Sequence, residues 1–295
     1  MSHAIAVCHG AFGRAALYEL DRTITTHAHR EGHLVFYVGG DAASLMVHNA
    51  RSDLTPGHAV AVSPWEPHSF HVPEGRINIC LVLYIKPMWF LENSDMAEFS
   101  LSFGRSRLTL NQRQRELLTR ITVLLMGNEN AMAFDELLFN LTQECFSLSW
   151  DQRHGRRPSA LRRFSDFRVR RSLRLIQEKV GEEMPIDEVA RSVGLSRPHF
   201  FKLFKQFMGV TPNVYINTLR SENAISDLLS TPKSVTDIAF DLGFSSQASF
   251  TRFFSSNVGI APSEYRRVAH VTSGAFPMMG DQTRLSGMPP SPRPN

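Results

Sequence analysis

The pattern of hydrophobic and polar positions changes once along the ordered part of the chain. From about Thr25 to Ile85, short apolar runs such as "HLVFYV", "AVAV" and "INICLVLYI" alternate with turn signals rich in Gly and Pro. Short strands at this spacing predict an antiparallel sandwich or barrel. After Pro87, apolar residues recur every three, four and seven positions, which predicts two amphipathic helices over residues 110–126 and 132–150.

The remainder of the chain divides by composition. Residues 151–160, "DQRHGRRPSA", are polar and basic, which is typical of a linker. Residues 161–269 have the periodicity of helices, whereas residues 270–295 are rich in Pro, Gly, Ser and Met without a period, which predicts a disordered tail. The predicted fold class is therefore α+β, with a β-rich domain over residues 1–150 and an all-α domain over residues 161–269.

The helical part contains an internal repeat. The stretch "IDEVARSVGLS" (186–196) aligns without gaps on "VTDIAFDLGFS" (235–245) at an offset of 49 residues. One residue is then inserted, and residues 200–212 align on residues 250–262 at an offset of 50. Each half therefore contains the same structural unit.

Each repeat has the parts of a helix-turn-helix in the required order. Gly194 and Gly243 can adopt the left-handed conformation that ends a first helix, and Ser196 and Ser245 can cap the next one. Residues 213–229 predict one rigid helix that connects the two units. The second helices should bury one apolar face each: Phe200, Leu203 and Phe204, then Phe250, Phe253 and Phe254. Because such units place their second helix in the major groove, this arrangement predicts DNA binding.

The charge distribution supports an anionic partner for the helical part. Residues 1–150 carry 11 Lys/Arg against 15 Asp/Glu, whereas residues 151–268 carry 19 against 12. A local excess of positive charge alone does not identify a partner. Together with two helix-turn-helix units it favours nucleic acid.

Residues 168–267 resemble the DNA-binding domain of AraC/XylS-family transcriptional regulators, most specifically in "DIAFDLGFSSQASFTRFFSSNVGIAPSEYRR". The resemblance implies a seven-helix domain that binds promoter DNA and activates transcription through RNA polymerase. The DNA-binding positions carried over are Arg197, Pro198, Phe201, Lys202, Lys205, Ser246, Gln247, Ser249, Thr251 and Arg252. Gln247 and Arg252 can pair bidentately with base edges. Arg197, Lys202 and Lys205 are expected on phosphates, and Phe201 either touches thymine methyls or belongs to the core.

Histidines gather in the amino-terminal half, where seven of the twelve lie between residues 27 and 71 and three fall in "THAHREGH". On a strand, His27, His29 and His33 share parity and therefore a face. This region resembles the cupin-like sensor barrel of many AraC-family regulators, and its histidine order resembles the cupin metal motif, with His33 at the position normally held by glutamate. The resemblance implies a divalent metal on His27, His29, His33 and His68, for which Zn, Fe, Ni and Cu are suitable. Two alternatives stay open: an organic effector held by His27, His29, Tyr37, Trp65 and His68, or a purely structural barrel.

The remaining features bound the function. The three cysteines, Cys8, Cys80 and Cys145, are widely spaced, as expected of reduced thiols. We find neither a secretory signal nor an apolar run of roughly 20 residues. The sequence therefore predicts a cytoplasmic protein without a membrane contact. The apolar faces of residues 110–150 predict a homodimer. The leading hypothesis is a transcriptional activator, not an enzyme, that responds to a small-molecule effector. The rivals are a cupin-type metalloenzyme with an accessory helical domain and an effector-independent architectural DNA binder.

Overall fold

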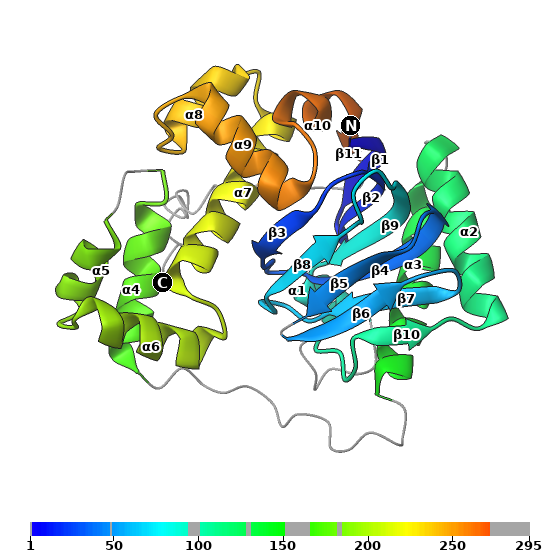
Figure 1. Ribbon diagram of the computed structural model, residues 1–295, viewed down its shortest axis with the longest axis horizontal. Helices are drawn as coiled ribbons and strands as arrows, with labels where there is room; N and C mark the ends of the chain where they lie inside the picture. The colour runs from blue at the N-terminus through cyan, green and yellow to red at the C-terminus, as the bar shows by residue number, and fades with distance from the viewer. Residues whose placement is uncertain are drawn as a thin grey trace, which may run out of the picture.

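The computed structural model describes residues 2–47, 49–93, 101–127, 131–150, 166–181 and 185–271. Within these residues the chain forms a β-rich amino-terminal part and a helical carboxy-terminal part that lie against each other (Figure 1). The predicted two-part organisation is thus confirmed at the level of fold. The predicted linker, residues 151–160, lies outside the described residues, and the predicted tail does so from residue 272 onward.

The amino-terminal part is built from two sheets. The larger has the strand order β10-β7-β4-β9-β2-β1-β11 and the smaller the order β3-β8-β5-β6. The strands are β1 (His3–Gly10), β2 (Gly13–Leu20), β3 (Ile24–His27), β4 (Gly32–Gly40), β5 (Ala43–Val47), β6 (Ala50–Leu54), β7 (His58–Val62), β8 (His68–His71), β9 (Asn78–Ile85), β10 (Arg107–Thr109) and β11 (Ala269–Val271). Among the described residues no strand pair joins the two sheets into a closed barrel, so the expected barrel is a two-sheet sandwich. Strands β1 and β2 precede the region that the pattern predicted as β.

Both faces of the larger sheet are buried, and alternate residues enter different cores. Val35 and Val82 face the smaller sheet, whereas Leu34, Phe36 and Leu83 face helices α2 (Gln112–Gly127) and α3 (Ala131–Ser149). This explains why β9 is a continuous apolar run, since a strand covered on both sides has no polar face. Helix α1 (Pro87–Asn93) follows β9. The two predicted amphipathic helices are confirmed.

Seven helices make up the described carboxy-terminal part. They are α4 (Phe167–Glu178), α5 (Ile186–Ser192), α6 (Arg197–Met208), α7 (Pro212–Ser230), α8 (Val235–Asp241), α9 (Gln247–Val258) and α10 (Pro262–Val268). Helix α7 is the predicted connecting helix, and it runs from the α4–α6 group to the α8–α10 group (Figure 1). The double helix-turn-helix expected from the repeat is therefore present.

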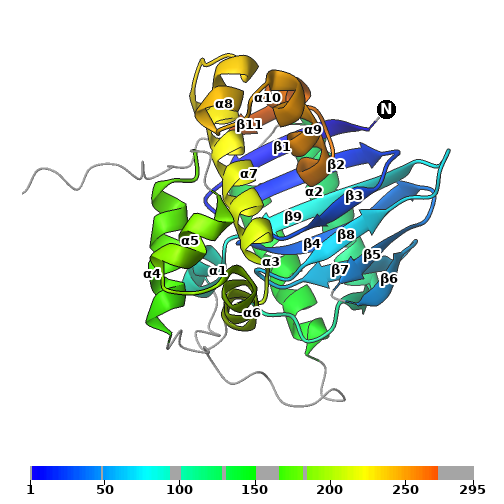
Figure 2. The same ribbon diagram turned by 60° about the vertical axis from the view of Figure 1, so that its left-hand side comes forward.

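The end of the described chain returns to the sandwich. Residues 269–271 form β11, which pairs in parallel with β1 through Val7, Cys8 and His9. The tail expected from residue 270 thus begins at least two residues too early, because backbone pairing orders a segment whose composition gives no strand signal. Figure 2 shows β11 beside β1, with α8–α10 above the same edge of the sheet.

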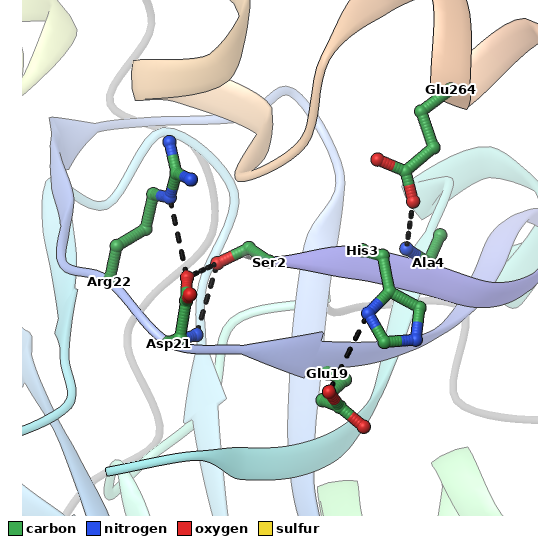
Figure 3. Close-up of polar contacts among 7 residues, drawn as sticks. All are labelled: Ser2, His3, Ala4, Glu19, Asp21, Arg22 and Glu264. Atoms are coloured by element: carbon green, nitrogen blue, oxygen red, sulfur yellow. Dashed lines mark hydrogen bonds and ion pairs between the residues drawn. The ribbon is translucent and has the colours of Figure 1, made fainter. Parts of the chain in front are cut away.

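Polar contacts close this edge. The Glu264 carboxylate on α10 accepts a hydrogen bond from the Ala4 backbone N–H at 3.1 Å, and it points from the helix toward β1 in Figure 3. Beneath it, the Ser2 hydroxyl donates to Asp21 at 2.6 Å and accepts from the Asp21 backbone N–H at 3.0 Å. The first described strand is therefore hydrogen-bonded to the helix that leads directly into the last described strand, β11.

Candidate functional sites: two DNA-contacting helices and a buried histidine cluster

The first helix-turn-helix unit consists of α5 and α6. Gly194 adopts a positive φ of 71°, as the turn requires, and Leu195 fills the corner with 7% exposure. Ser196 is the N-cap residue of α6, but its side chain makes no capping hydrogen bond. Phe200, Leu203 and Phe204 are buried as predicted. The outer face of α6 carries Arg197, Pro198, Lys202 and Lys205, all of which are exposed.

Phe201 occupies a position between the two expected roles. Its ring packs partly against the core of the first unit and meets Phe200 edge-on at 6.4 Å. The Arg197 guanidinium lies over the Phe201 ring at 5.5 Å and also pairs with Asp187 at 3.3 Å. The Phe201 ring therefore holds the Arg197 guanidinium on the outer face of α6 and also covers the edge of the buried core.

The second unit consists of α8 and α9. Ser234 and Asp237 form a capping box at the start of α8, and Gly243 has a positive φ of 76° at the turn. The cap of α9 is Ser246 and not Ser245 as expected, because the residue inserted after the turn shifts the helix start by one position. The Ser246 hydroxyl accepts from the Ser249 backbone N–H at 3.2 Å.

The predicted DNA-binding residues of α9 lie on its first turns. Gln247 and Arg252 are exposed, whereas Ser246, Ser249 and Thr251 are half-buried. The Gln247 side-chain oxygen accepts a hydrogen bond from the Thr236 hydroxyl at 2.7 Å, which holds that amide at the helix start. Amino-terminal residues of the second helix are those that contact base edges in helix-turn-helix proteins. The two side chains best able to recognise bases are therefore the two that are most accessible.

The second candidate site lies inside the sandwich. His27 ends β3, His33 belongs to β4, His68 begins β8, and His29 lies in the loop between β3 and β4. One ring nitrogen of each of His27, His29 and His68 can serve as a metal ligand, and these three nitrogens all lie within 4.8 Å of one another. The His33 ring centroid is 4.3 Å from that of His68 and 5.3 Å from that of His29. Three of the four histidines proposed as metal ligands thus have ring nitrogens within 4.8 Å of one another, and the His33 ring packs beside the rings of His68 and His29.

Hydrogen bonds determine the protonation of two of these rings. His27 Nδ1 lies 2.6 Å from the Thr25 carbonyl oxygen, and His68 Nδ1 lies 2.8 Å from the Glu66 carbonyl oxygen. A carbonyl can only accept, so both Nδ1 atoms donate their protons and both Nε2 atoms keep a lone pair. His68 Nε2, His29 Nε2 and both ring nitrogens of His33 are buried without a hydrogen-bond partner among the described residues.

Burial keeps the cluster uncharged at neutral pH. It lowers the pKa of His27 to about 4, and it lowers the pKa of His29, His33 and His68 well below the ordinary value. Neighbouring histidines and Arg14 add to the effect, because a further positive charge beside them is unfavourable. Neutral imidazoles are the form that binds metal ions.

The other predicted effector residues do not join the histidines. Tyr37 lies four residues after His33 on β4, about 13 Å along the strand, and its hydroxyl donates to the Gly40 carbonyl at 2.7 Å. Trp65 is adjacent through its backbone, since its N–H donates to the His29 carbonyl at 2.7 Å. Its ring, however, stacks on Tyr215 of α7 at 5.0 Å. The contacts described for these two rings are thus with Gly40 and Tyr215 and not with the histidines.

Comparison with known proteins decides what the helical part is. A family described as "Helix-turn-helix domain" matches residues 189–268. The probable transcriptional regulator LumQ of Photobacterium leiognathi is 24% identical over 84% of this chain and 94% of its own length. The melibiose operon regulatory protein of Escherichia coli is 30% identical over half of each chain. The carboxy-terminal part is an AraC-type helix-turn-helix domain.

One solved structure extends the likeness to the whole architecture. Unsaturated fatty acid bound ToxT from Vibrio cholerae matches with a TM-score of 0.53 and 16% identity, over 86% of this chain and 94% of ToxT. At that identity the match shows the fold alone, a β-rich amino-terminal part followed by the AraC-type domain.

None of the helices described in this chain is long and apolar enough to cross a membrane.

The AraC-type domain contacts the segments that carry the histidines. The Thr218 hydroxyl on α7 donates to the Ala28 carbonyl at 2.9 Å, and Arg30 pairs with Glu222 on the same helix at 2.8 Å. The Thr25 hydroxyl donates to the Ser256 carbonyl of α9 at 3.2 Å. Residues directly beside His27 and His29 therefore touch both the connecting helix and the second recognition helix.

A buried aromatic and cationic group forms the rest of the domain contact. Arg14 lies over the Tyr84 ring at 3.7 Å and donates to the Tyr265 hydroxyl at 3.1 Å, while His9 Nε2 lies 2.8 Å from the same hydroxyl. Tyr84 also meets His29 and His33 edge-on at 5.0 and 5.3 Å. Tyr265 belongs to the stretch that resembles the AraC/XylS family, but a single arginine in an apolar strand gives no signal that it lies at a domain interface.

Proposed function

We propose that this chain is a sequence-specific DNA-binding transcriptional regulator, an activator controlled by a small molecule that binds to its amino-terminal sandwich. The observation that carries the proposal is the exposure pattern of α6 and α9. Each helix buries an aromatic face, α6 in the core of the first unit and α9 in a core shared with the sandwich, and each leaves exposed polar side chains on its first turns. A duplicated unit of this kind in an AraC-type domain is suited to two successive major grooves of promoter DNA.

The exposed side chains divide by chemistry. Gln247 and Arg252 can each make two hydrogen bonds to one base edge, so we assign them to base recognition. The exposed ammonium and guanidinium groups on α6 are assigned to DNA phosphates: Arg197, Lys202 and Lys205. The half-buried hydroxyls are assigned to positioning the start of α9: Ser246, Ser249 and Thr251.

Control by an effector is supported by the shared architecture and by the domain contacts. ToxT, a fold neighbour, has been solved with an unsaturated fatty acid. In the present chain the sandwich contacts both α7 and α9 through residues of one short segment, from Thr25 to Arg30. A ligand that moves this segment therefore also changes its contacts with α7 and α9.

A homodimer that recruits RNA polymerase completes the proposal. Helices α2 and α3 cover the outer face of the larger sheet, yet Val123 and Met126 on α2 remain 62% exposed. Exposed apolar side chains on a helix that is already partnered favour a second copy of that helix. Sedimentation of the purified chain as a monomer at micromolar concentration contradicts this part.

The test is binding to DNA from upstream of the protein's own gene, measured against scrambled DNA of equal length. Gln247→Ala and Arg252→Ala should each weaken specific binding by about 1 to 3 kcal/mol, because a bidentate base contact is lost. Arg51→Ala, an exposed arginine on the sandwich, is the matched control and should have no effect. Equal affinity for specific and scrambled DNA, or unchanged binding by both α9 variants with helical content intact, contradicts the proposal.

A further inference from the structure

We propose that the four-histidine cluster, His27, His29, His33 and His68, binds one divalent transition-metal ion and that the AraC-type domain senses its occupancy. The regulatory half of this inference rests on the proposed function, whereas the metal site itself stands on the geometry of the sandwich. The ion is thereby named as the effector class, in place of an organic ligand held by Tyr37 and Trp65.

The first argument is the number of unsatisfied donors. Buried polar nitrogens are almost always hydrogen-bonded, since leaving one without a partner costs about 1 to 3 kcal/mol. Here four buried imidazole nitrogens on His29, His33 and His68 lack a partner among the described residues, and they lie in one cluster. A single bound cation can take the lone pair of one nitrogen from each ring, so it satisfies several of these nitrogens at once.

The second argument is orientation. The Thr25 and Glu66 carbonyls accept the Nδ1 protons of His27 and His68 and so leave Nε2 of each ring as a metal donor. Such outer hydrogen bonds are the usual support of a metal-ligating histidine. In a tetrahedral site with metal–nitrogen distances of about 2.0 to 2.1 Å, the nitrogens lie about 3.4 Å apart. The donors of His27, His29 and His68, already within 4.8 Å, reach that spacing by ring movements of about 1 Å.

The third argument is selectivity. Four neutral imidazoles suit Zn²⁺, Cu²⁺, Ni²⁺ or Fe²⁺, whereas Mg²⁺ and Ca²⁺ require oxygen ligands. The His33 ring, whose centroid lies 4.3 Å from that of His68, has two buried nitrogens without a hydrogen-bond partner among the described residues, and it supplies a fourth nitrogen if it turns toward the other three. Because the side chains of the cluster offer nitrogen donors alone, the later first-row metals are favoured.

The fourth argument concerns transmission to the AraC-type domain. Thr25, whose carbonyl orients His27, donates its hydroxyl to α9. Ala28, between His27 and His29, accepts from Thr218 of α7, and the His29 carbonyl accepts from Trp65, whose ring stacks on α7. Drawing the imidazoles together around an ion moves the backbone at these contacts. Metal binding thus biases the placement of both helices.

The first experiment is titration of the full chain with Zn²⁺ or Co²⁺, followed by dialysis in excess Mg²⁺ and elemental analysis. We expect about one Zn²⁺ per chain and a tetrahedral absorption spectrum with Co²⁺. His68→Ala and His33→Ala should each weaken affinity at least about tenfold, while His71→Ala, an exposed histidine on the same strand as His68, should retain it. Wild-type chain that retains no Zn²⁺, or His68→Ala that binds as tightly as wild type, overturns the site. The wild-type titration needs no variant to fold.

The second experiment measures affinity for the upstream DNA with Zn²⁺ and with a chelator. We expect a change of about fivefold or more in wild type and none in His68→Ala, as for an allosteric ligand. A chain that binds Zn²⁺ but whose DNA affinity is unchanged overturns the sensing step. If the chain binds the upstream DNA but takes up no Zn²⁺, the metal site is overturned and the proposed function stands. If the chain takes up Zn²⁺ but does not bind the DNA, the proposed function is overturned and the metal site stands.

Discussion

The two helix-turn-helix units share a sequence pattern, yet they attach to the sandwich differently. The second unit has no separate core: Phe250, Phe254 and Tyr265 belong to the same buried cluster as Val35 and Val82 of the larger sheet. The first unit is centred on its own cluster, to which the described sandwich residues contribute Ala28 and the partly buried Trp65. A duplicated motif can therefore keep its internal packing while only one copy becomes part of the sensor domain.

The largest expected effect distinguishes the two cores directly. Phe204 and Phe254 are equivalent in the repeat and are both fully buried, so replacing either with alanine should cost about 3 to 5 kcal/mol. Phe254→Ala should accelerate hydrogen exchange in α9 and in strands β2 and β9, because one core spans them. Phe204→Ala should accelerate exchange in α4 to α6 and in the first half of α7, which shares this core through Tyr215, Ile216 and Leu219, but not in the strands. Exchange confined to α8–α10 in Phe254→Ala contradicts the shared core.

Acid should loosen the second unit before the first. Burial, aided by the positive Arg14, lowers the pKa of His9 to about 3 at the contact with Tyr265. The unfolded chain, with an ordinary pKa near 6.5, takes up the proton first as the pH falls. The contribution of His9 to the free energy of unfolding is therefore present in full above pH 6.5. It is lost as the pH falls toward 3, by up to about 1.4 kcal/mol per pH unit.

Urea unfolding at a series of pH values across that range measures the effect. His9→Leu should reduce the slope of stability against pH, although the variant itself loses the hydrogen bond to Tyr265. A steeper slope in His9→Leu contradicts the assignment.

The difference between the two units also marks what the sequence could predict. Spacing of Gly194 and Gly243, and of the buried phenylalanines, predicts both units because those requirements are local. Nothing local distinguishes Phe254 from Phe204, since the sheet that covers α9 comes from the opposite end of the chain. The one-residue insertion was visible, but its consequence, that Ser246 caps α9 in place of Ser245, depends on which hydroxyl reaches the helix start.

The histidine cluster was more predictable than the rest of its surroundings. Shared parity along the strands predicted that His27, His29 and His33 lie on one face, and the resemblance to cupins added His68. Tyr37 was expected near the same site, but its position four residues beyond His33 on β4 places it about 13 Å farther along the strand. Arg14 and β11 escaped prediction because each depends on a partner more than two hundred residues away, Tyr265 and β1 respectively.

An intermediate effect is expected at the hydrogen bond between α7 and the sandwich. Thr218→Val keeps the shape of the side chain but leaves the buried Ala28 carbonyl without its donor, at a cost of about 1 to 3 kcal/mol. Hydrogen exchange should rise in α7 and the first unit, which has few other contacts with the sandwich, and stay unchanged in α10 and β11. Thr218→Ser, which retains the hydroxyl, should behave as wild type. Equal exchange in the valine and serine variants contradicts a role for this bond.

The smallest expected effect separates the caps of the two recognition helices. Ser246 accepts a hydrogen bond from the Ser249 N–H, whereas Ser196 holds the equivalent N-cap position of α6 without one. Ser246→Ala should therefore cost about 1 kcal/mol, the usual value of an engaged cap, and Ser196→Ala should stay within about 0.5 kcal/mol of wild type. Denaturant unfolding of the two variants side by side decides this. Equal losses would mean that α6 gains its cap in solution and that the two copies begin their recognition helices alike.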